Sequence, residues 1–257
     1  MNVKAVREVE TLAARAWPAL EILDLDGWRL RWSAGYTRRA NSVWPQHFGG
    51  STPIEARLEV VESLYARRGV RPRYQLSAST EPASLPARLA ERGYRREVET
   101  SVETVALGRW AKSLRRHPLG NIVVSGDHYP DERWWSVWTE VEGATPAARA
   151  TAEAMLQRIP APSLYAVAEQ DGRPVSVGRA VLDGGWLGVF SVGTVGGARR
   201  QGAARGVMRW LAAWAEEGGA ARAYLQVEVP NRPARRLFAD AGFRPLYRYT
   251  YWSANGS

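Results

Sequence analysis

The sequence predicts an α/β protein with a mixed sheet, arranged in two lobes. Strand-like alternation and apolar residues at helical spacing follow one another along the whole chain. A polar, basic segment between Gly108 and Gly120 predicts a boundary between a first lobe, residues 1–115, and a second lobe, residues 116–257. With 257 residues, 45% hydrophobic content and 12 Trp, the chain is large enough to bury a substantial core.

The first lobe is predicted to mix strands and helices. Apolar residues from Ile54 to Tyr65 recur at helical spacing, and the run that ends Val98, Thr100, Val102, Thr104 alternates as a strand does. In chain order the predicted elements are strands at 27–32 and 40–44, a helix at 54–65, a strand at 73–77, a helix at 82–91 and the strand-like run.

The second lobe is predicted to contain more regular structure. Asp171-Gly172 and Asp183-Gly184-Gly185 are typical hairpin turns, and Gly218-Gly219 ends a helix. In chain order the predicted elements are a strand at 122–124, helices at 131–141 and 147–158, strands at 164–169, 175–181 and 186–192, a helix at 202–217, a strand at 223–227, a helix at 232–241 and a strand at 244–252.

Composition excludes several function classes. There is no Cys and the three His are scattered, so we expect no metal site. The net charge of +9 comes from Arg residues interleaved with Glu and Ala rather than from one basic run, so we expect no nucleic-acid partner. The N-terminal residues include acidic side chains and no stretch approaches about 20 apolar residues, so we expect a cytoplasmic protein with no membrane partner.

The two halves of the chain contain a weak internal repeat. Residues 85–103 and residues 235–252 both indicate a helix, a Gly-aromatic pair and a long strand. A duplicated fold with one degenerate copy would explain this, because the first lobe has no glycine-arginine loop like that of the second.

That loop, at residues 189–206, is the most informative segment of the sequence. An apolar strand leads through small residues directly into an amphipathic helix. Small residues let backbone N–H groups approach an anion, and the helix N-terminus adds unsatisfied donors and a positive dipole end. Arg199, Arg200 and Arg205 add positive charge, so the loop predicts binding of a phosphate ester or pyrophosphate.

Two of the three phosphate-binding families that use such loops do not fit. A P-loop requires Gly-Lys-Ser/Thr at the helix start, and this loop contains no Lys. A dinucleotide-binding fold requires parallel strands, whereas hairpins precede this loop.

The third family fits, and a second motif strengthens the match. The loop motif Arg199-x-x-Gly202-x-Ala204 resembles the Q/R-x-x-G-x-G/A loop of GCN5-related N-acetyltransferases (GNAT). Downstream, the family pattern N-x-x-A-x-x-L-Y-x-x-x-G-F is resembled by Asn231-x-x-Ala234-x-x-Leu237-Phe238-x-x-x-Gly242-Phe243. The resemblance covers residues 122–252, and the segment at 32–44 resembles the N-terminal half of two-lobed members.

The resemblance implies a GNAT fold with acetyl-CoA as co-substrate. The strands Trp186–Val192 and Ala223–Val227 would splay apart, with the pantetheine arm between them. Backbone groups of Val192–Thr194 would polarise the thioester carbonyl, and the Asn231 side chain would contact the arm or cap the next helix. The cofactor-binding residues implied are Val192, Gly193, Thr194, Arg199, Arg200, Gln201, Gly202, Ala203, Ala204, Arg205, Asn231, Arg235 and Phe238.

The chain departs from the family pattern at two positions used for proton transfer. Phe238 stands where the family often has a Tyr acid, and Gln226 stands where some members have a Glu base. The catalytic candidates are therefore Glu228, Tyr249 and Tyr165, with Tyr247 and Glu142 as further replacements. Trp134 and Trp138 share a helix face and are interpreted either as core residues or as a wall of the acceptor pocket.

The function predicted is an acetyl-CoA-dependent N-acetyltransferase that acts on a primary amine of a small molecule or peptide, as a monomer or homodimer. The alternative is a non-catalytic acyl-CoA-binding or sensing protein, because Phe238 and Gln226 remove the usual proton-transfer groups.

Overall fold

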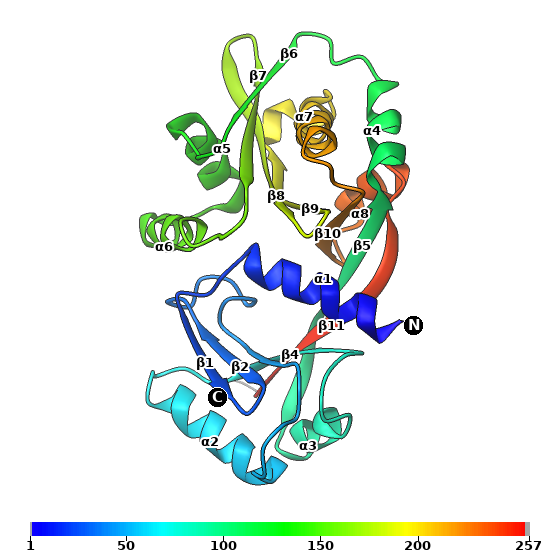
Figure 1. The fold of residues 1–257 in the computed structure, drawn as a ribbon. Helices are drawn as coiled ribbons and strands as arrows, with labels where there is room; N and C mark the ends of the chain where they lie inside the picture. The colour runs from blue at the N-terminus through cyan, green and yellow to red at the C-terminus, as the bar shows by residue number, and fades with distance from the viewer. Residues whose placement is uncertain (1, 255–257) are drawn as a thin grey trace.

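One continuous sheet of 11 strands runs through both lobes of the molecule (Figure 1). The computed structural model describes residues 2–254. The strands lie in the order β1-β2-β3-β4-β11-β5-β10-β9-β8-β7-β6, and both parallel and antiparallel pairs occur. The predicted mixed α/β class is confirmed. No helix within residues 2–254 is long and apolar enough to cross a bilayer.

The elements of the first lobe agree with the strands and helices expected there and add three more. The predicted repeat of helix and strand near the lobe's end is present as α3 and β5. Strand β1 and helices α1 and α4 were not predicted. The bounds are α1 (Val3–Arg15), β1 (Glu21–Leu25), β2 (Trp28–Trp32), β3 (Val43–Pro45), α2 (Ile54–Ala66), β4 (Arg73–Ser77), α3 (Leu85–Glu91), β5 (Tyr94–Ala106) and α4 (Leu107–Arg115).

In the second lobe every predicted helix and strand is present. The two predicted hairpins join β7 to β8 and β8 to β9 as antiparallel pairs. The bounds are β6 (Ile122–Asp127), α5 (Glu132–Glu142), α6 (Pro146–Leu156), β7 (Ser163–Gln170), β8 (Arg173–Asp183), β9 (Trp186–Thr194), a 3₁₀ turn (Gly196–Ala198), α7 (Ala203–Glu217), β10 (Arg222–Glu228), α8 (Arg232–Asp240) and β11 (Arg244–Ala254).

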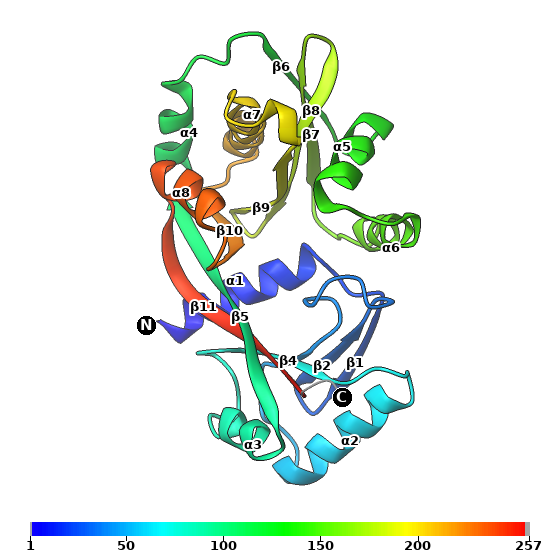
Figure 2. The same ribbon diagram turned by 180° about the vertical axis from the view of Figure 1, so that it is seen from behind.

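Helices cover both faces of the sheet in the second lobe (Figure 2). Alternate residues of a strand point to opposite faces, and β7 follows this rule. Leu164, Ala166 and Ala168 pack in the cluster that contains α7, whereas Tyr165 and Val167 pack in the cluster that contains α5 and α6. Because α7 packs on one face of the sheet, the loop that precedes α7 is held at that face.

Strands β5 and β11 join the two lobes. β5 pairs with β10 from Arg222↔Ala106 to Glu228↔Thr100, and β11 pairs with β5 and, beyond Tyr249↔Ser77, with β4. The two strands that carry the internal repeat thus lie antiparallel to each other. Each follows a short helix and a glycine with positive φ, so the repeat has a structural counterpart.

Residues near the predicted lobe boundary contribute to the core of the second lobe. Leu107, Trp110 and Leu114 of α4 are buried in the same cluster as α7, and the Trp110 ring meets Phe243 edge-on at 5.2 Å. By sequence α4 and β5 lie before residue 116, yet both contact elements that follow it. The division into domains at 115/116 stays a prediction.

Helix α1 lies between the lobes (Figure 1). Val6, Val9 and Leu12 form a cluster with residues of β5, β8, β9, β10 and β11, among them Phe190 and Tyr249. The helix begins at an Asn2 cap that accepts hydrogen bonds from two backbone N–H groups. It packs against Phe190 and Tyr249, two residues that also line the cavity described next.

Candidate active site

The parallel strands β9 and β10 separate before they end. Their pairing runs from Arg222↔Trp186 to Leu225↔Val189 and stops there, although β9 continues to Thr194 and β10 to Glu228. This is the separation of strands that the resemblance to the GNAT family implied. Backbone groups beyond Val189 and Leu225 are free of this pairing and border an open space.

A bulge in β9 lies in the separated segment. On β8 the register passes from Val177 to Arg179, while on β9 it passes from Gly193 to Phe190, so β9 has one extra residue. Ser191 has a φ of 52°, which L-residues adopt with strain. Because Ser191 and Val192 line the adjacent cavity, the bulge turns this stretch of backbone toward it.

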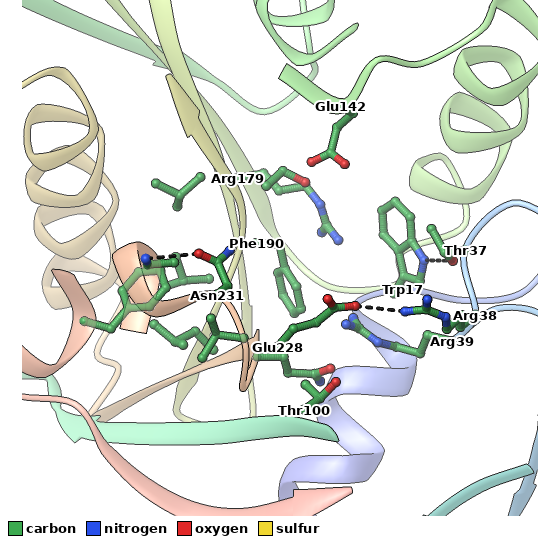
Figure 3. Close-up of a pocket in the computed structure, with 18 of the residues that line it drawn as sticks. Trp17, Thr37, Arg38, Arg39, Thr100, Glu142, Arg179, Phe190, Glu228 and Asn231 are labelled. Carbon is green, nitrogen blue, oxygen red and sulfur yellow. Dashed lines mark hydrogen bonds and ion pairs between the residues drawn. The ribbon is translucent and has the colours of Figure 1, made fainter. Parts of the chain in front are cut away.

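A cavity of about 580 Å³ occupies the splay (Figure 3). Its walls come from six regions: the separated ends of β9 and β10, helix α8, the end of α5, the loop between β2 and β3, the segment after α1 that holds Trp17, and strands β5, β8 and β11. The volume falls within the range of small-molecule sites. Both lobes therefore contribute to one site.

The N-terminus of α7 has the features of an anion site. Gly202 has a φ of 98°, no side chain caps the helix, and its first turn contains no acidic residue. The first N–H groups of such a helix lack intrahelical partners, and the helix dipole is positive there. Arg199 and Arg200 are exposed beside this end and Arg205 is half-buried, so the local charge favours a phosphate.

Other predicted cofactor residues have contacts within the protein. The Arg199 Nε donates to the Thr194 carbonyl at 3.3 Å, and Gln201 accepts from the Gln170 amide at 2.8 Å. A side chain at Gly193 would meet the Val141 Cγ1 at 2.5 Å, so close packing of α5 on β9 explains this glycine. Ala203 is buried under the loop, and Ala204 is half-buried.

Helix α8 presents one face to the cavity. Asn231, Ala234 and Phe238 all line it. The Asn231 Oδ1 accepts from the Ala234 N–H at 3.2 Å, which confirms its capping role and leaves its Nδ2 available to a ligand. Arg235 lies 3.9 Å from Glu103, a buried residue of β5.

Two of the predicted catalytic residues line the cavity. The Tyr249 hydroxyl donates to the Gln226 Oε1 at 2.8 Å, so this Tyr and the Gln that replaces the family's Glu are in direct contact. Glu228 accepts from Arg38 at 2.9 Å. Tyr165 lies in a different cavity, beside His128 and Trp135, and Tyr247 is buried among the residues that pack against α1.

Glu142, at the end of α5, points into the cavity (Figure 3). The residue as a whole is exposed, but nearby protein removes part of the water around its carboxyl group, and this desolvation raises the pKa of Glu142 above its usual value. A carboxylate with a raised pKa is a better proton acceptor near neutral pH. Trp138, on the same helix, is buried and also lines the cavity, whereas Trp134 and Trp135 are core residues.

Sequence reasoning missed the arginines of the cavity wall. Arg179 of β8 is 1% exposed, and Arg39 lies in the loop between β2 and β3. The sequence does contain a signal for Arg179, because it is the one charged residue between Val175 and Val181, a stretch of β8 that is otherwise apolar or small and is buried. The contribution of the loop could not be predicted, because it depends on how the two lobes pack.

Comparisons with known proteins agree with this geometry. The family described as probable histone acetyltransferase Rv0428c, C-terminal, matches residues 4–252. The chain belongs to this family. A relative named uncharacterized N-acetyltransferase YobR, from Bacillus subtilis, is 28% identical over 251 residues, which are 96% of this chain and 97% of that protein. A probable histone acetyltransferase, Rv0428c of Mycobacterium tuberculosis, is 32% identical over 149 residues, 57% of this chain and 43% of that protein.

Comparison with solved structures shows that this chain has a GNAT fold. A GCN5-related N-acetyltransferase from Kribbella flavida superposes with a TM-score of 0.73 at 17% identity and covers 98% of this chain and 96% of that chain. A tandem GNAT protein from the clavulanic acid biosynthesis pathway gives a TM-score of 0.56 at 16% identity, covering 79% and 70%. The predicted GNAT fold is confirmed, and the chain is an acetyltransferase of this type.

Proposed function

We propose that the protein transfers an acetyl group from acetyl-CoA to a primary amine, at the cavity between β9 and β10. The observation that carries this proposal is the uncapped N-terminus of α7 beside the splayed strands. The first offers backbone donors to a pyrophosphate, and the second leaves space for the pantetheine arm. The residues present therefore fit acetyl-CoA.

Each part of the site has a separate task in binding. Gly202 to Arg205, with Arg199 and Arg200, would hold the pyrophosphate. The free Asn231 Nδ2 would donate to the arm, and backbone groups at the β9 bulge would stabilise negative charge on the thioester oxygen. When bound, the thioester supplies the acetyl group: a C–N bond to the amine forms while the C–S bond breaks.

Two side chains of the cavity would move the protons. Glu142 is the favoured base, since partial desolvation raises its pKa, whereas Glu228 is already paired with Arg38. The amine proton would pass to the Glu142 carboxylate. Tyr249 would give its phenolic proton to the departing thiolate, while its contact with Gln226 fixes the ring. Tyr165 has no role in this proposal because it lies in another cavity.

Binding and turnover test the proposal in sequence. We expect acetyl-CoA to raise the melting temperature and to give a calorimetric isotherm with one site per chain. We then expect thiol release from acetyl-CoA in the presence of an amine from a panel of amino acids, dipeptides, aminoglycosides and lysine-rich peptides. Absence of acetyl-CoA binding at millimolar concentration would reject the proposal.

A further inference from the structure

Two arginines of the cavity have no acidic partner. Within residues 2–254, no carboxylate oxygen is found within ion-pair distance of Arg39 or Arg179, although both line the cavity. Arg38, in contrast, is paired with Glu228 at 2.9 Å and with Glu97 at 3.1 Å. Two positive charges of the cavity are therefore not neutralised by the protein.

The Arg179 guanidinium is buried with unused hydrogen-bond donors. Its Nη2 donates to the Ala16 carbonyl at 3.0 Å, but its Nε and Nη1 have no partner in the described chain. The guanidinium lies over the rings of Trp17, at 4.8 Å, and Phe190, at 4.4 Å, and points into the cavity (Figure 3). Leaving buried donors of a charged group unpaired is costly, so an anionic ligand would recover this energy.

Arg39 faces the same space from the first lobe. Its Nε is also buried without a partner. Burial is the main cause that lowers the pKa of Arg179 to about 10; Tyr165 opposes this lowering, and the charge of Arg39 adds to it. Both side chains therefore remain cations at neutral pH. Two cations that line one cavity favour an anion that can contact both.

The position of Arg39 is fixed by Asn41. The Asn41 Oδ1 accepts from the Ser33 and Gly35 N–H groups, and its Nδ2 donates to the Tyr36 and Thr37 carbonyls, at 2.7–3.1 Å. One side chain thus ties together both ends of the loop that carries Arg39. A pre-formed loop loses little entropy on binding a ligand.

The aromatic side of the cavity, which we call its acceptor end, limits the size of the ligand. Trp17, Tyr36 and Trp138 form an aromatic wall. The ring centroid of Tyr36 lies 6.0 Å from that of Trp17 and 6.2 Å from that of Trp138. The cavity of about 580 Å³ must also admit the reacting end of the acetyl donor. Space remains for a small molecule, and the aromatic wall suits an apolar side chain better than a second cation.

We propose that the acceptor is a small amine that carries a carboxylate, such as an amino acid, and that Arg39 and Arg179 bind this carboxylate. This inference rests on the proposed acetyl transfer, because it takes Glu142 as the group that faces the amine. The carboxylate satisfies the unused donors, while the apolar part of the acceptor lies against the aromatic wall. A lysine-rich peptide would add positive charge beside two unneutralised arginines.

Calorimetry with matched ligand pairs tests the inference without turnover. The twenty amino acids and a set of dipeptides are titrated into the protein, each against its own carboxamide, which is similar in shape but carries no negative charge and has an NH2 group in place of one carboxylate oxygen. We expect the best acid to bind at least about tenfold more tightly than its amide, because hydrogen bonds between two charged groups are stronger than those to a neutral group. The dipeptide arm distinguishes a free amino acid from a peptide terminus.

Three variants locate the carboxylate. Arg39→Gln and Arg179→Gln should each reduce the ratio of acid to amide affinity to near one. Arg38→Gln makes the same charge change at an arginine that is already paired, so the ratio should persist. If Arg179→Gln lowers the melting temperature, its loss of preference for the acid could reflect unfolding. Arg39→Gln then tests the carboxylate site by itself, since Arg39 is only half-buried and its replacement should disturb the fold less.

The outcomes separate the inference from the proposed function. Equal binding of every acid and its amide, or tighter binding of a lysine-rich peptide, would overturn the carboxylate site even if acetyl-CoA binds. Preference for the acid without acetyl-CoA binding would keep the carboxylate site and reject the proposed transfer.

Discussion

The chain contains two junctions of the same design, and only one is open to an anion. In the first lobe β3 pairs in parallel with β4, and a loop at residues 46–53 leads into α2. In the second lobe β9 pairs in parallel with β10, and a loop at residues 195–202 leads into α7. Neither helix has a side-chain cap. The backbone path alone therefore does not decide which junction binds a ligand.

The first junction is filled by its own side chains. Arg57 of α2 is fully buried, lies over the Phe48 ring at 4.2 Å and donates to the Gly49 carbonyl. The Phe48 N–H donates to the Glu81 carboxylate at 3.2 Å, and Glu55 adds an acidic group to the first turn of α2. A backbone donor that would meet an anion is occupied by a carboxylate of the protein.

The second junction lacks such internal anions. Its loop contacts are made by Arg199 and Gln201, and α7 has no acidic residue in its first turn. The difference teaches that the chemistry of a few side chains, rather than the strand-loop-helix geometry, separates a binding loop from a structural one. The predictions below change these side chains, from the largest expected effect to the smallest.

Replacing the side chain that fills the first junction should be the most damaging change. Arg57→Ala leaves a void beside Phe48 and removes the partner of Asp26, so we expect a loss of about 3 kcal/mol in the free energy of unfolding. Urea denaturation measures this loss. Arg67→Ala, on the exposed end of the same helix, should cost less than about 0.5 kcal/mol. Weaker acetyl-CoA binding by folded Arg57→Ala would contradict the contrast between the junctions.

The base beside the second junction should govern the pH dependence of turnover. Because partial desolvation raises the pKa of Glu142, its carboxylate accepts a proton as pH falls through that raised value, and activity is lost on this acidic side. Glu142→Gln should lower kcat by about 100-fold and abolish the acidic limb of the profile of kcat against pH. Glu228→Gln should keep that limb. If it is Glu228→Gln that removes the limb, the roles assigned to the two carboxylates are exchanged.

Reversing one charge at the second junction should make it resemble the first. Arg205→Glu places a carboxylate in the first turn of α7, as Glu55 does in α2. Acetyl-CoA affinity should fall by about tenfold or more, while the melting temperature stays equal or rises, since an acidic group favours a helix N-terminus. Arg209→Glu, at an exposed position one turn later, is the matched control. Equal losses in both variants would indicate a general charge effect instead of a specific site.

The two junctions also show what could be predicted from the sequence. The second was recognised because small residues, Arg199 and Gly202 form a local pattern that precedes a helix. The first was not recognised as a counterpart, because its features depend on contacts between Phe48, Arg57 and Glu81, which lie far apart along the chain. A local pattern therefore predicts the loop before α7, whereas the filled junction before α2 results from contacts between residues far apart along the chain.

The same limit applies to the acceptor end of the site. Asn231 and Phe238 were found through a motif on one helix, and both line the cavity. Arg39 and Arg179 line one cavity because β5 of the first lobe pairs with β10 and β11 of the second, and β11 pairs in turn with β4. Pairing at such separations leaves no local signature. Helix α1 was not predicted for a related reason: its apolar residues pack against strands that lie far from it along the chain.

The smallest expected effect concerns the position where this chain departs from the family pattern. Phe238 lines the cavity on α8, and Tyr249 offers the nearest phenol among the residues proposed for catalysis. If Tyr249 already protonates the thiolate, Phe238→Tyr should raise kcat by less than about threefold in the unmodified protein. It should nevertheless restore much of the activity that Tyr249→Phe removes, because a phenol is again available. A large gain from Phe238→Tyr alone, with no loss in Tyr249→Phe, would show that the proton donor is absent from the native site.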